Sequence, residues 1–548
     1  MITPSTLWHT VRYLRPVQFY GRLWFRFKHP KPDLRPALPL RANPASWTVP
    51  ASRQPSLIAP TTFRFLGTAA CLDTVGWDKK EIDKLWRYNL HYFDDLNATG
   101  ADERVKWHYE IIQRWVTENA TGQGTGWEPY PVSLRMVNWI KWALAGNPHA
   151  PEILHSLTVQ ARWLSKRLEI HLMGNHLYAN AKALLFAGMF FAGPEAENWL
   201  EKGFSLLRRE TREQILPDGG QFERSPMYHA IALEDLLDII NITRTYHAAV
   251  PGRWRGWVAQ LPEVARRMRI WLAAMCHPDH EIAFFNDAAM GIAPSSAELE
   301  SYAQRLGLAP LSALPDGLLT LAESGYLRVH RNQMVALLDV APIGPDYLPG
   351  HAHADTLSFE LSLFGQRFLV NSGTSCYGIR EERTRQRSTA AHNTVVLDGL
   401  NSSEVWSGFR VARRARPLGL EIRESGEAMS ISCSHDGYRW LKGRPQHTRN
   451  WHFCNHELLI EDTVTGNFKQ GNARFHLHPS ITVGDIDPCG FTTELRLPTG
   501  QIVSFGVEGG DLRKEISSWH PEFGYSEPTC CLSVQFRGPL LRTRIKWE

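Results

Sequence analysis

The chain has 548 residues, more than one ordinary domain holds, so roughly two to four domains are expected. Apolar residues make up 43% and charged residues 21%, which excludes a disordered chain and a collagen-like fibre. The formal net charge is only +4, so the basic excess of a nucleic-acid-binding protein is missing and we expect no nucleic-acid partner. A local basic cleft would still be compatible with a polyanionic substrate.

The cysteines and the N-terminus bear on the compartment. Eight cysteines are spread along the chain without CxxC or Cys–His spacing, so we expect no disulfide framework and a reducing compartment. The first residues lack the pattern of a secretory signal, and no stretch of about 18 apolar residues could span a membrane. We therefore expect a cytoplasmic protein without a transmembrane segment, with the periplasm as the alternative.

The N-terminal segment, residues 1–77, is predicted to be an extended arm. Its first sixty residues are rich in proline and basic residues, as in HPKPDLRPALPL. The arginines and aromatic residues between Tyr13 and Lys28 would suit a membrane surface or a partner. We interpret this part as an arm that docks on the body of the protein itself.

Residues 78–315 have a helical hydrophobic period. In YHAIALEDLLDIINIT, the apolar residues Leu233, Leu236, Leu237 and Ile240 follow the spacing of one buried helix face. Similar stretches recur, and proline and glycine separate them. The pattern predicts a helical domain.

Residues 316–548 change to the period of strands. In SFELSLFGQRFLVNSG, the apolar residues Phe359, Leu361 and Leu363 alternate with polar ones, which predicts a half-buried strand. Strand-like segments bounded by turn residues continue to the end of the chain. A helical half followed by an all-β half indicates a multidomain α+β protein with its domains in series.

Four polar clusters in the chain are candidates for chemistry. They are Asn175 and His176 in MGNHLYAN, Glu223, Arg224, Tyr228 and His229 in DGGQFERSPMYH, His351, His353 and Asp355 in GHAHAD, and Arg387 and His392 in RSTAAHNTVV. A single histidine is more often packed or solvated than catalytic. The HxHxD pattern is sharper, because two histidines two residues apart point the same way in an extended segment. No GxSxG motif is present, so acyl-transfer hydrolysis has no support.

In this order, the clusters resemble the heparinase II/III-type polysaccharide lyases, a family that includes alginate, heparin and heparan lyases. The resemblance runs from LWRYNLHYFDDL through GWEPYPVSLRMVNWIKWAL, GNHLYANAKALLFAG and DGGQFERSPMYH to GHAHADTLSFELSLFG and AAHNTVVLDGLNSSEVW. It implies an N-terminal incomplete (α/α) toroid followed by a C-terminal antiparallel β-sandwich. This agrees with the change of period near residue 315.

The resemblance also implies β-elimination on a 4-linked uronic acid within an acidic polysaccharide or oligosaccharide. Removal of the C5 proton requires a base, an acid at the leaving O4 oxygen, and neutralisation of the adjacent carboxylate. It assigns Asn175 and His176 to the carboxylate and Tyr228 to protonation of O4, and in some members Tyr228 also takes the C5 proton. His351 is implied as the base for the other C5 stereochemistry.

Tyr228 can act as a base only if its phenolate is accessible. A cationic Arg224 or His229 close to its hydroxyl would lower its pKa and make the phenolate accessible.

Further side chains are candidates for holding substrate groups. They are Asn89, His91, Arg135, Asn138, Glu223, Arg224 and Tyr377. Arg135 and Asn138 are three residues apart and would share one helix face. The alternative for these residues is a solvent-exposed face. A homodimer remains open.

Family members often carry a structural Zn2+ in the β domain, bound by two histidines and an aspartate. His353 and His392 match the histidines, whereas Asn371 stands where the aspartate is expected. Because a neutral amide is a poorer ligand than a carboxylate, this difference puts zinc binding in question.

Two other functions compete with the lyase. An inverting glycoside hydrolase on an acidic polysaccharide would need two carboxyl groups about 6.5–9.5 Å apart, and Asp218, Glu223 and Asp287 are the candidates. A non-catalytic exopolysaccharide-binding or assembly protein would have lost the tyrosine or the histidine. Both Tyr228 and His351 are present, which favours an enzyme.

Overall fold

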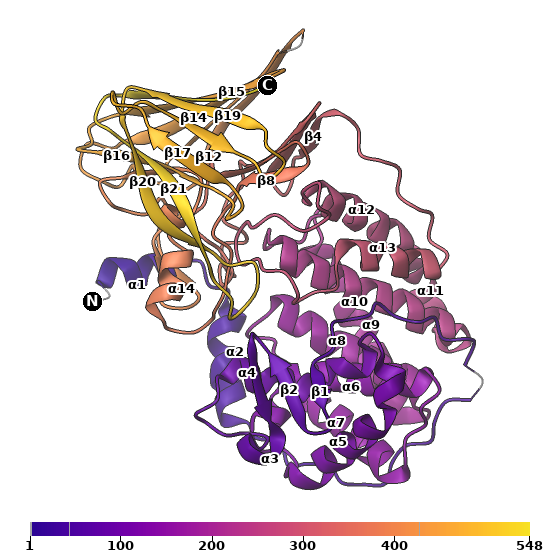
Figure 1. Cartoon of the computed structure of the whole chain (residues 1–548). Helices are drawn as coiled ribbons and strands as arrows, with labels where there is room; N and C mark the ends of the chain where they lie inside the picture. Colours follow the sequence, from indigo (N-terminus) through magenta and orange to yellow (C-terminus); the bar gives the residue numbers. More distant parts are fainter. Residues whose placement is uncertain (1–2, 43, 427) are drawn as a thin grey trace.

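The structure, a computed structural model, describes residues 3–42, 44–426 and 428–548. Helices dominate up to Arg305, and strands dominate from Gly317 onward. In Figure 1 the helical part and the sheet-rich part form two bodies that lie against each other. The predicted fold, a helical domain followed by antiparallel sheets, is confirmed.

The N-terminal segment is an extended arm only in its middle, because helices and a small sheet flank residues 28–39. It contains helices α1 (Pro4–Val11) and α2 (Pro16–Phe27) and a small antiparallel sheet. The strands of this sheet are β1 (Leu57–Ala59), β2 (Thr62–Phe65) and β3 (Thr68–Cys71). Both helices have a proline in the first turn, where the missing N–H costs nothing, and the Thr3 side chain caps α1. The proline-rich stretch HPKPDLRPALPL starts no helix, and residues 28–39 lie outside helices and strands, as expected of an extended arm.

The toroid is built from helices whose apolar faces meet in one large core. Its helices are α3 (Leu72–Val75), α4 (Lys84–Tyr92), α5 (Val105–Glu118), α6 (Pro129–Leu144), α7 (Pro151–Lys166), α8 (Gly174–Phe190), α9 (Pro194–Gln214), α10 (Pro226–Thr245), α11 (Gly252–Val258), α12 (Leu261–Ala274) and α13 (Ser296–Arg305). The predicted helix face at Leu233, Leu236, Leu237 and Ile240 lies on α10 and is buried. The spacing of these apolar residues in the sequence therefore located the helix correctly.

The C-terminal part is made of antiparallel sheets around a second core. A five-stranded sheet contains β4 (Gly317–Leu321), β5 (Tyr326–Arg331), β6 (Met334–Asp339), β7 (Phe359–Leu363) and β8 (Gln366–Leu369). An eight-stranded sheet contains β12 (Pro417–Ser425), β13 (Ala428–His435), β14 (Gln446–Cys454), β15 (Glu457–Thr465), β22 (Leu540–Trp547), β19 (Ile502–Glu508), β18 (Thr492–Arg496) and β17 (Thr482–Ile486). Smaller sheets contain β20 (Asp511–Trp519), β21 (Glu527–Phe536), β16 (Gly471–His476) and β9 (Val395–Leu397), and the pair β10 (Val405–Trp406) and β11 (Arg410–Val411). The short helix α14 (Glu381–Gln386) lies between β8 and β9 in the chain.

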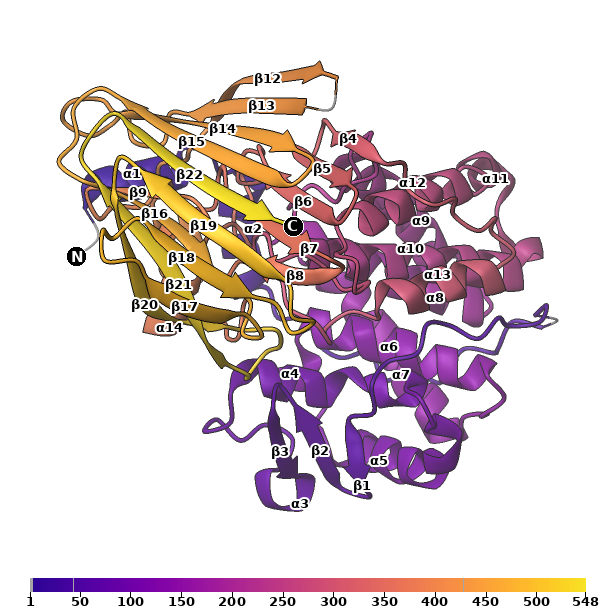
Figure 2. The ribbon, with the colours of Figure 1, turned by 45° about the horizontal axis from the view of Figure 1, so that its top comes forward.

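The five-stranded sheet lies between the large sheet and the toroid (Figures 1 and 2). This position explains why β7 is buried on both faces rather than half-buried as its alternation predicted. Its polar residues Glu360 and Ser362 face His277, which follows α12, at 2.6 and 2.7 Å. The polar face of β7 thus meets the toroid instead of water, and the same interface carries the candidate site.

Candidate active site

A buried carboxylate, Asp287, lies at the centre of the candidate site, in the loop between α12 and α13. Its two oxygens accept hydrogen bonds from His351 Nδ1 and His353 Nε2, each at 2.8 Å. The guanidinium of Arg383, on α14, forms a two-pronged ion pair with the same carboxylate, with Nη2 at 2.7 Å. One side chain from the toroid region therefore fixes three side chains of the sheet domain.

The surroundings of Asp287 favour its ionised form. Burial by itself would raise its pKa, but the Arg383 charge and the hydrogen bonds from His351 and His353 hold that pKa well below the ordinary value. Because Asp287 binds His351 through Nδ1, the Nε2 atom of His351 is left free to point into the site. A histidine held in this way is suited to act as a base.

Tyr228, in the first turn of α10, completes the centre of the cluster. Its ring lies against the His351 ring, with centroids 3.9 Å apart, and its hydroxyl lies 2.9 Å from the Tyr377 hydroxyl. The N-cap residue Ser225 holds this helix start in place, because its hydroxyl accepts from the Tyr228 N–H and donates to the Asp287 carbonyl. Tyr228 and Tyr377, expected as catalytic and substrate-binding residues, are thus brought together with His351.

The pKa of Tyr228 is raised, which corrects the idea that a nearby cation lowers it. Burial and the neighbouring Tyr377 and Asp287 raise that pKa well above the ordinary value. Arg224 points away and donates from Nε to the Ser324 carbonyl at 2.8 Å. Burial lowers the pKa of His229 to about 4, so its ring is neutral at physiological pH. Tyr228 is therefore a protonated phenol, suited to give a proton rather than to take one.

The first turn of α8 forms the opposite wall and carries Asn175 and His176. His176 pairs with Glu169 at 3.2 Å and stacks on Tyr130, with ring centroids 4.4 Å apart. Burial alone would lower the pKa of His176, but the negative charge of Glu169 raises it above the ordinary value. Asn175 is half-buried, and within the described chain its side chain has no hydrogen-bond partner. A histidine with a raised pKa and a free amide therefore lie next to each other in the chain.

Glu223 links the two walls. Its Oε2 lies 3.8 Å from His351 Nε2, and a Cβ atom at Gly174, the first residue of α8, would lie 3.3 Å from its Oε1. Burial raises the pKa of Glu223, although His351 opposes this effect. The carboxyl group therefore lies buried inside the cluster.

Three of the expected substrate-binding residues belong to the wall of the toroid. Arg135 is fully buried, stacks on Trp115 at 3.7 Å and donates to Gln160 and to the His91 and Gly126 carbonyls. His91 is also buried, accepts from Trp115 Nε1 at 2.9 Å, and has a pKa that burial lowers to about 3. Asn138 bonds to the Tyr92 carbonyl, to Asp94 and to Asn97. Apart from His91 Nε2, which is buried without a partner, the polar groups of these three side chains are hydrogen-bonded within the protein, and substrate contact at them stays a prediction.

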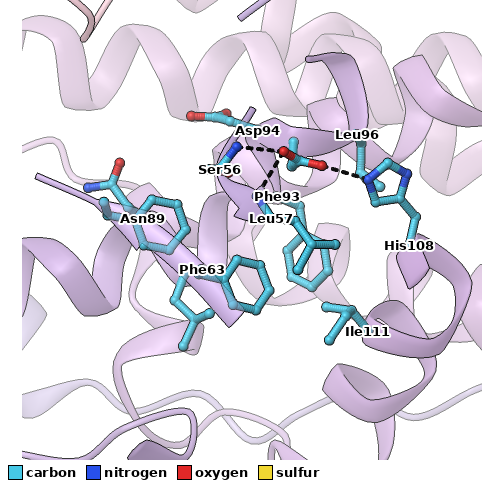
Figure 3. Close-up of a pocket in the computed structure, with 12 residues that line it drawn as sticks. Ser56, Leu57, Phe63, Asn89, Phe93, Asp94, Leu96, His108 and Ile111 are labelled. Atoms are coloured by element: carbon cyan, nitrogen blue, oxygen red, sulfur yellow. Dashed lines mark hydrogen bonds and ion pairs between the residues drawn. The ribbon is translucent and has the colours of Figure 1, made fainter. Parts of the chain in front are cut away.

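Asn89 lies apart from the Tyr228 cluster. Its amide donates to the Leu85 carbonyl at 2.8 Å, and it lines a small pocket near the β1–β2 edge (Figure 3). The dashed contacts in that view belong to Asp95, which accepts from the Ser56 and Leu57 N–H groups and bonds to His108. The pocket is thus held by a structural carboxylate.

Arg224 links the toroid to the sheet domain. It has a left-handed backbone, with φ of +61°, and its guanidinium donates to carbonyls of the β4–β5 turn. Its own carbonyl accepts from the Tyr326 hydroxyl of β5 at 2.7 Å. The residue just before α10 therefore fastens the toroid to the sheet domain.

The expected zinc residues come together only in part. His353 Nδ1 and His392 Nε2 face each other at 3.1 Å, and His392 Nδ1 bonds to the Ser388 carbonyl. The Asn371 oxygen accepts from the Asn393 N–H at 3.1 Å, while its buried amide nitrogen has no partner. No group of three His, Cys, Asp or Glu residues placed to hold a metal is found in the described chain. The two imidazoles fit a metal ion, and the third position offers only a neutral oxygen.

Comparison with known proteins decides the family. The sequence profile of the heparinase II/III N-terminus matches residues 65–308, and that of the heparinase II/III-like C-terminal domain matches residues 314–548. The chain belongs to the heparinase II/III family. It is a polysaccharide lyase, an enzyme that acts on a polysaccharide.

Individual relatives agree with this assignment. A heparin-sulfate lyase of Bacteroides stercoris is 26% identical over 80% of this chain and 71% of its own length. A heparin-sulfate lyase of Pedobacter heparinus is 26% identical over 59% of this chain and 53% of its own length. The crystal structure of a heparinase III has the same fold, with a TM-score of 0.70 at 17% identity, over 100% of this chain and 94% of that one.

Sequence reasoning missed the central roles of Asp287 and Arg383. The sequence identified Asp287 only as a candidate carboxylate of a hydrolase and indicated no role for Arg383. The segment FFNDAAMG offered a local signal, a polar pair directly after an apolar run. The partners of Asp287 lie 64 to 96 positions away, so the sequence could not show what it binds.

Proposed function

We propose that this lyase cleaves a uronate-containing polysaccharide by β-elimination at the Tyr228–His351 cluster. The observation that carries the proposal is the stack of His351 on Tyr228, with Asp287 behind the imidazole and Asn175 and His176 across the site. This arrangement offers a base, an acid and a pair of carboxylate-binding side chains within one cluster.

His351 is proposed as the base that removes the C5 proton. Asp287 holds its Nδ1–H and stabilises the imidazolium that forms, so the free Nε2 can accept the proton. Tyr228 is proposed as the acid at the O4 leaving group, because its pKa is raised and it holds its proton. The Tyr377 hydroxyl, 2.9 Å away, can orient that proton and resupply it.

Asn175 and His176 are proposed to neutralise the uronate carboxylate. Negative charge develops next to this carboxylate when C5 loses its proton, so donors directed at it stabilise the transition state. His176 has a raised pKa and is a cation over a wider pH range than a free imidazole. The polymer class, heparan-like or another uronate polysaccharide, depends on contacts beyond this centre.

The geometry argues against an inverting hydrolase. Asp287 is occupied by Arg383, His351 and His353, and its lowered pKa prevents it from acting as an acid. Asp218 accepts from the Ser324 N–H at 2.7 Å and from the Ser324 hydroxyl at 2.8 Å. Only Glu223 remains near the cluster, whereas hydrolysis of this type needs two free carboxyl groups.

Tyr228→Phe tests the proposal. The variant keeps the ring and deletes the proton donor, so we expect kcat to fall by about 10²–10⁴-fold with a nearly unchanged melting temperature. The assay follows the ultraviolet absorbance of the unsaturated uronate product on a panel of alginate, heparan sulfate and unsulfated uronate polymers. Tyr525→Phe, at an exposed tyrosine of the sandwich, is the matched control. Turnover of Tyr228→Phe within a few-fold of the parent enzyme would contradict the assigned role.

We also propose a structural zinc site at His353 and His392, with the Asn371 oxygen as a weak third ligand. The support is the 3.1 Å approach of the two imidazole nitrogens. Zinc bound there would hold the segments of His353 and His392 together and take no part in the elimination.

Asn371→Asp should strengthen this zinc site, because a carboxylate is a better ligand than an amide for a dication. We expect about 10-fold tighter zinc binding in a competition titration, a change typical of one altered group at a metal site. His353→Ala should remove the bound zinc. Equal zinc content in the parent protein, His353→Ala and Asn371→Asp would refute the assignment.

For the compartment, we propose the cytoplasm. The eight cysteines are all free in the structure, as expected where thiols stay reduced. Among the described residues, no helix is both long and apolar enough to cross a bilayer. Cell fractionation with an antibody to the chain tests this proposal, and recovery in the periplasmic fraction would reject it.

A further inference from the structure

The N-terminal helix α2 has its apolar face turned away from the protein. Gln18 is buried and donates to the Tyr347 carbonyl at 3.0 Å, and buried Gly21 lies against His171. The large side chains Phe19, Tyr20, Leu23, Trp24 and Phe27 lie on the other side and are 50–75% exposed. A surface helix of a globular protein normally shows the reverse pattern, with its apolar stripe facing the core.

Helix α1 extends this exposed surface. Leu7 and Trp8 are 51% and 61% exposed, while the buried Thr10 accepts a hydrogen bond from Trp406 Nε1 at 3.1 Å. We call the exposed apolar side chains of the two helices, Leu7, Trp8, Phe19, Tyr20, Leu23, Trp24 and Phe27, the arm face. These seven belong to 22 large apolar side chains that are exposed in the described chain, yet the two helices have only 8 and 12 residues. Such clustering marks an interaction surface.

Basic residues surround the arm face. Residues 12–31 contain six Lys or Arg and no Asp or Glu. Arg15 pairs with Glu213, whereas no carboxylate of the described chain pairs with Arg22, Arg26 or Lys28. Lys28 lies over the Trp24 ring at 4.4 Å, at the end of α2. The positive charge around this surface is therefore available to an external anion.

We propose that the arm face binds the surface of an anionic lipid bilayer. The apolar side chains would enter the boundary between headgroups and acyl chains, with the tryptophans and Tyr20 at headgroup level and the cations on the phosphates. Exposed apolar residues on one helix face with Lys and Arg beside them are the pattern of an interfacial helix. The charge complementarity selects anionic rather than neutral lipid.

A sugar-binding platform fits the arm face less well. Such platforms combine flat aromatic rings with hydrogen-bonding side chains, whereas Leu7 and Leu23 offer neither. The depression on this surface is lined by Tyr20, Gly21, Leu23, Trp24, Phe27 and Ile170, which are nearly all apolar. A second copy of the chain would bring the same cations against each other and would be disfavoured by their repulsion.

Helix α2 contacts the segment that leads to His351. The Gln18 side chain holds the carbonyl of Tyr347, four residues before His351, and Arg15 stacks on the Tyr347 ring at 3.6 Å. In both views α2 lies at the side of the toroid next to the sheet-rich part (Figures 1 and 2). A bilayer bound to the arm face would therefore be connected, through α2 and Tyr347, to the segment that carries His351.

Vesicle sedimentation with the full chain tests the proposal. The two probes are vesicles of phosphatidylcholine with phosphatidylglycerol and vesicles of phosphatidylcholine alone. We expect at least 10-fold stronger binding to the anionic vesicles, and weaker binding as salt is raised. Three variants are compared: Phe19→Ser/Leu23→Ser/Trp24→Ser, Arg26→Gln/Lys28→Gln, and the control Phe491→Ser/Ile502→Ser, whose side chains are similarly exposed on the sandwich.

Each variant has a distinct expected result. The apolar triple variant should lose binding by more than 10-fold, and the charge variant by about 5-fold per removed cation, or about 25-fold in all. The sandwich control should bind as the parent protein does. Because the charge variant changes only exposed ends of side chains, it keeps the test decisive even where the triple variant folds poorly.

Three outcomes would overturn the proposal. The first is a parent protein that stays in the supernatant with both kinds of vesicle. The second is arm variants that bind vesicles unchanged. The third is a parent protein that does not bind vesicles, together with arm variants that lose self-association or lose retention on immobilised alginate or heparan sulfate. That last result would assign the arm face to a second copy or to a glycan.

Discussion

At the scale of single residues, Asp287 shows how one carboxylate organises a site. It directs His351 through Nδ1, holds His353 toward His392, and neutralises the buried Arg383. Arg383 in turn lies over the Tyr377 ring at 4.9 Å, which places the second tyrosine of the cluster. A buried charge is tolerated here because every charged group has a partner.

The pH dependence of substrate binding is expected to follow His176. Its pKa is raised by Glu169, with Glu223 and Glu128 acting in the same direction, so the cation persists above the pH at which a free imidazole loses its proton. KM should stay constant below the raised pKa and increase as pH rises through it. The stabilising Glu169–His176 pair is likewise complete below about pH 6.5, the unfolded value, and is lost as pH rises through the folded pKa.

His176→Gln provides the measurement. The amide keeps a donor but cannot be charged, so KM should rise by about 10-fold at low pH, the lower end for a charge-assisted hydrogen bond, and lose its pH dependence. A change confined to kcat, or an unaltered KM profile, would place His176 away from the carboxylate.

At the scale of elements, α8 owes its position to close packing against α9. A Cβ atom at Gly188 would lie 2.6 Å from the Leu200 N atom, and one at Gly203 would lie 2.8 Å from the Leu185 N atom. The backbones of the two helices therefore nearly touch. Since α8 begins at Gly174, the packing of α8 against α9 determines where Asn175 and His176 lie.

Gly188→Ala is expected to destabilise the protein. The added methyl group cannot fit without moving α9, which should lower the free energy of unfolding by about 1–3 kcal/mol and raise KM as Asn175 shifts. Gly256→Ala in α11 is the matched control, because nothing lies within 4 Å of the added Cβ. The control should gain up to about 1 kcal/mol from helix propensity. Equal denaturant midpoints for the two variants would refute the packing argument.

At the scale of the whole molecule, the site exists only where two domains meet. Asn175, His176, Glu223 and Tyr228 come from the toroid, whereas His351 belongs to the sheet domain. A shared apolar cluster that includes Trp271 of α12 and Leu337 of β6 joins the two parts. Catalysis therefore depends on the contact between the domains as much as on the residues themselves.

Arg224→Met tests this dependence. The variant keeps an apolar stem but removes the bonds to the β4–β5 turn, so we expect a loss of about 1–2 kcal/mol in stability. The kcat should fall by more than KM changes, because Tyr228 and His351 lose their alignment. Arg266→Met, at an exposed i,i+3 pair with Glu263, should cost less than about 0.5 kcal/mol and leave activity unchanged. Parallel melting curves and kinetics decide between these results.

Sequence patterns determined the order of the domains and much of the local structure. Period 3.6 located the buried face of α10, and period 2 located β7, because side-chain spacing along one element is a local property. The motifs around Tyr228 and His351 indicated the family, since long ordered motifs survive in the chain itself. Local reasoning missed α1 and α2, each with a proline in its first turn, although residues 28–39 between α2 and β1 lie outside helices and strands as expected.

Tertiary structure alone decided which polar residues form the site. Arg135 and Asn138 share a helix with the expected spacing, yet they bond to the toroid's own backbone, whereas Asp287 and Arg383 become central through contacts 96 positions apart. The polar face of β7 is buried because the toroid covers it. The physical reason is the same in each case: spacing along the chain fixes which way a side chain points, and only the packing of distant elements determines what it meets.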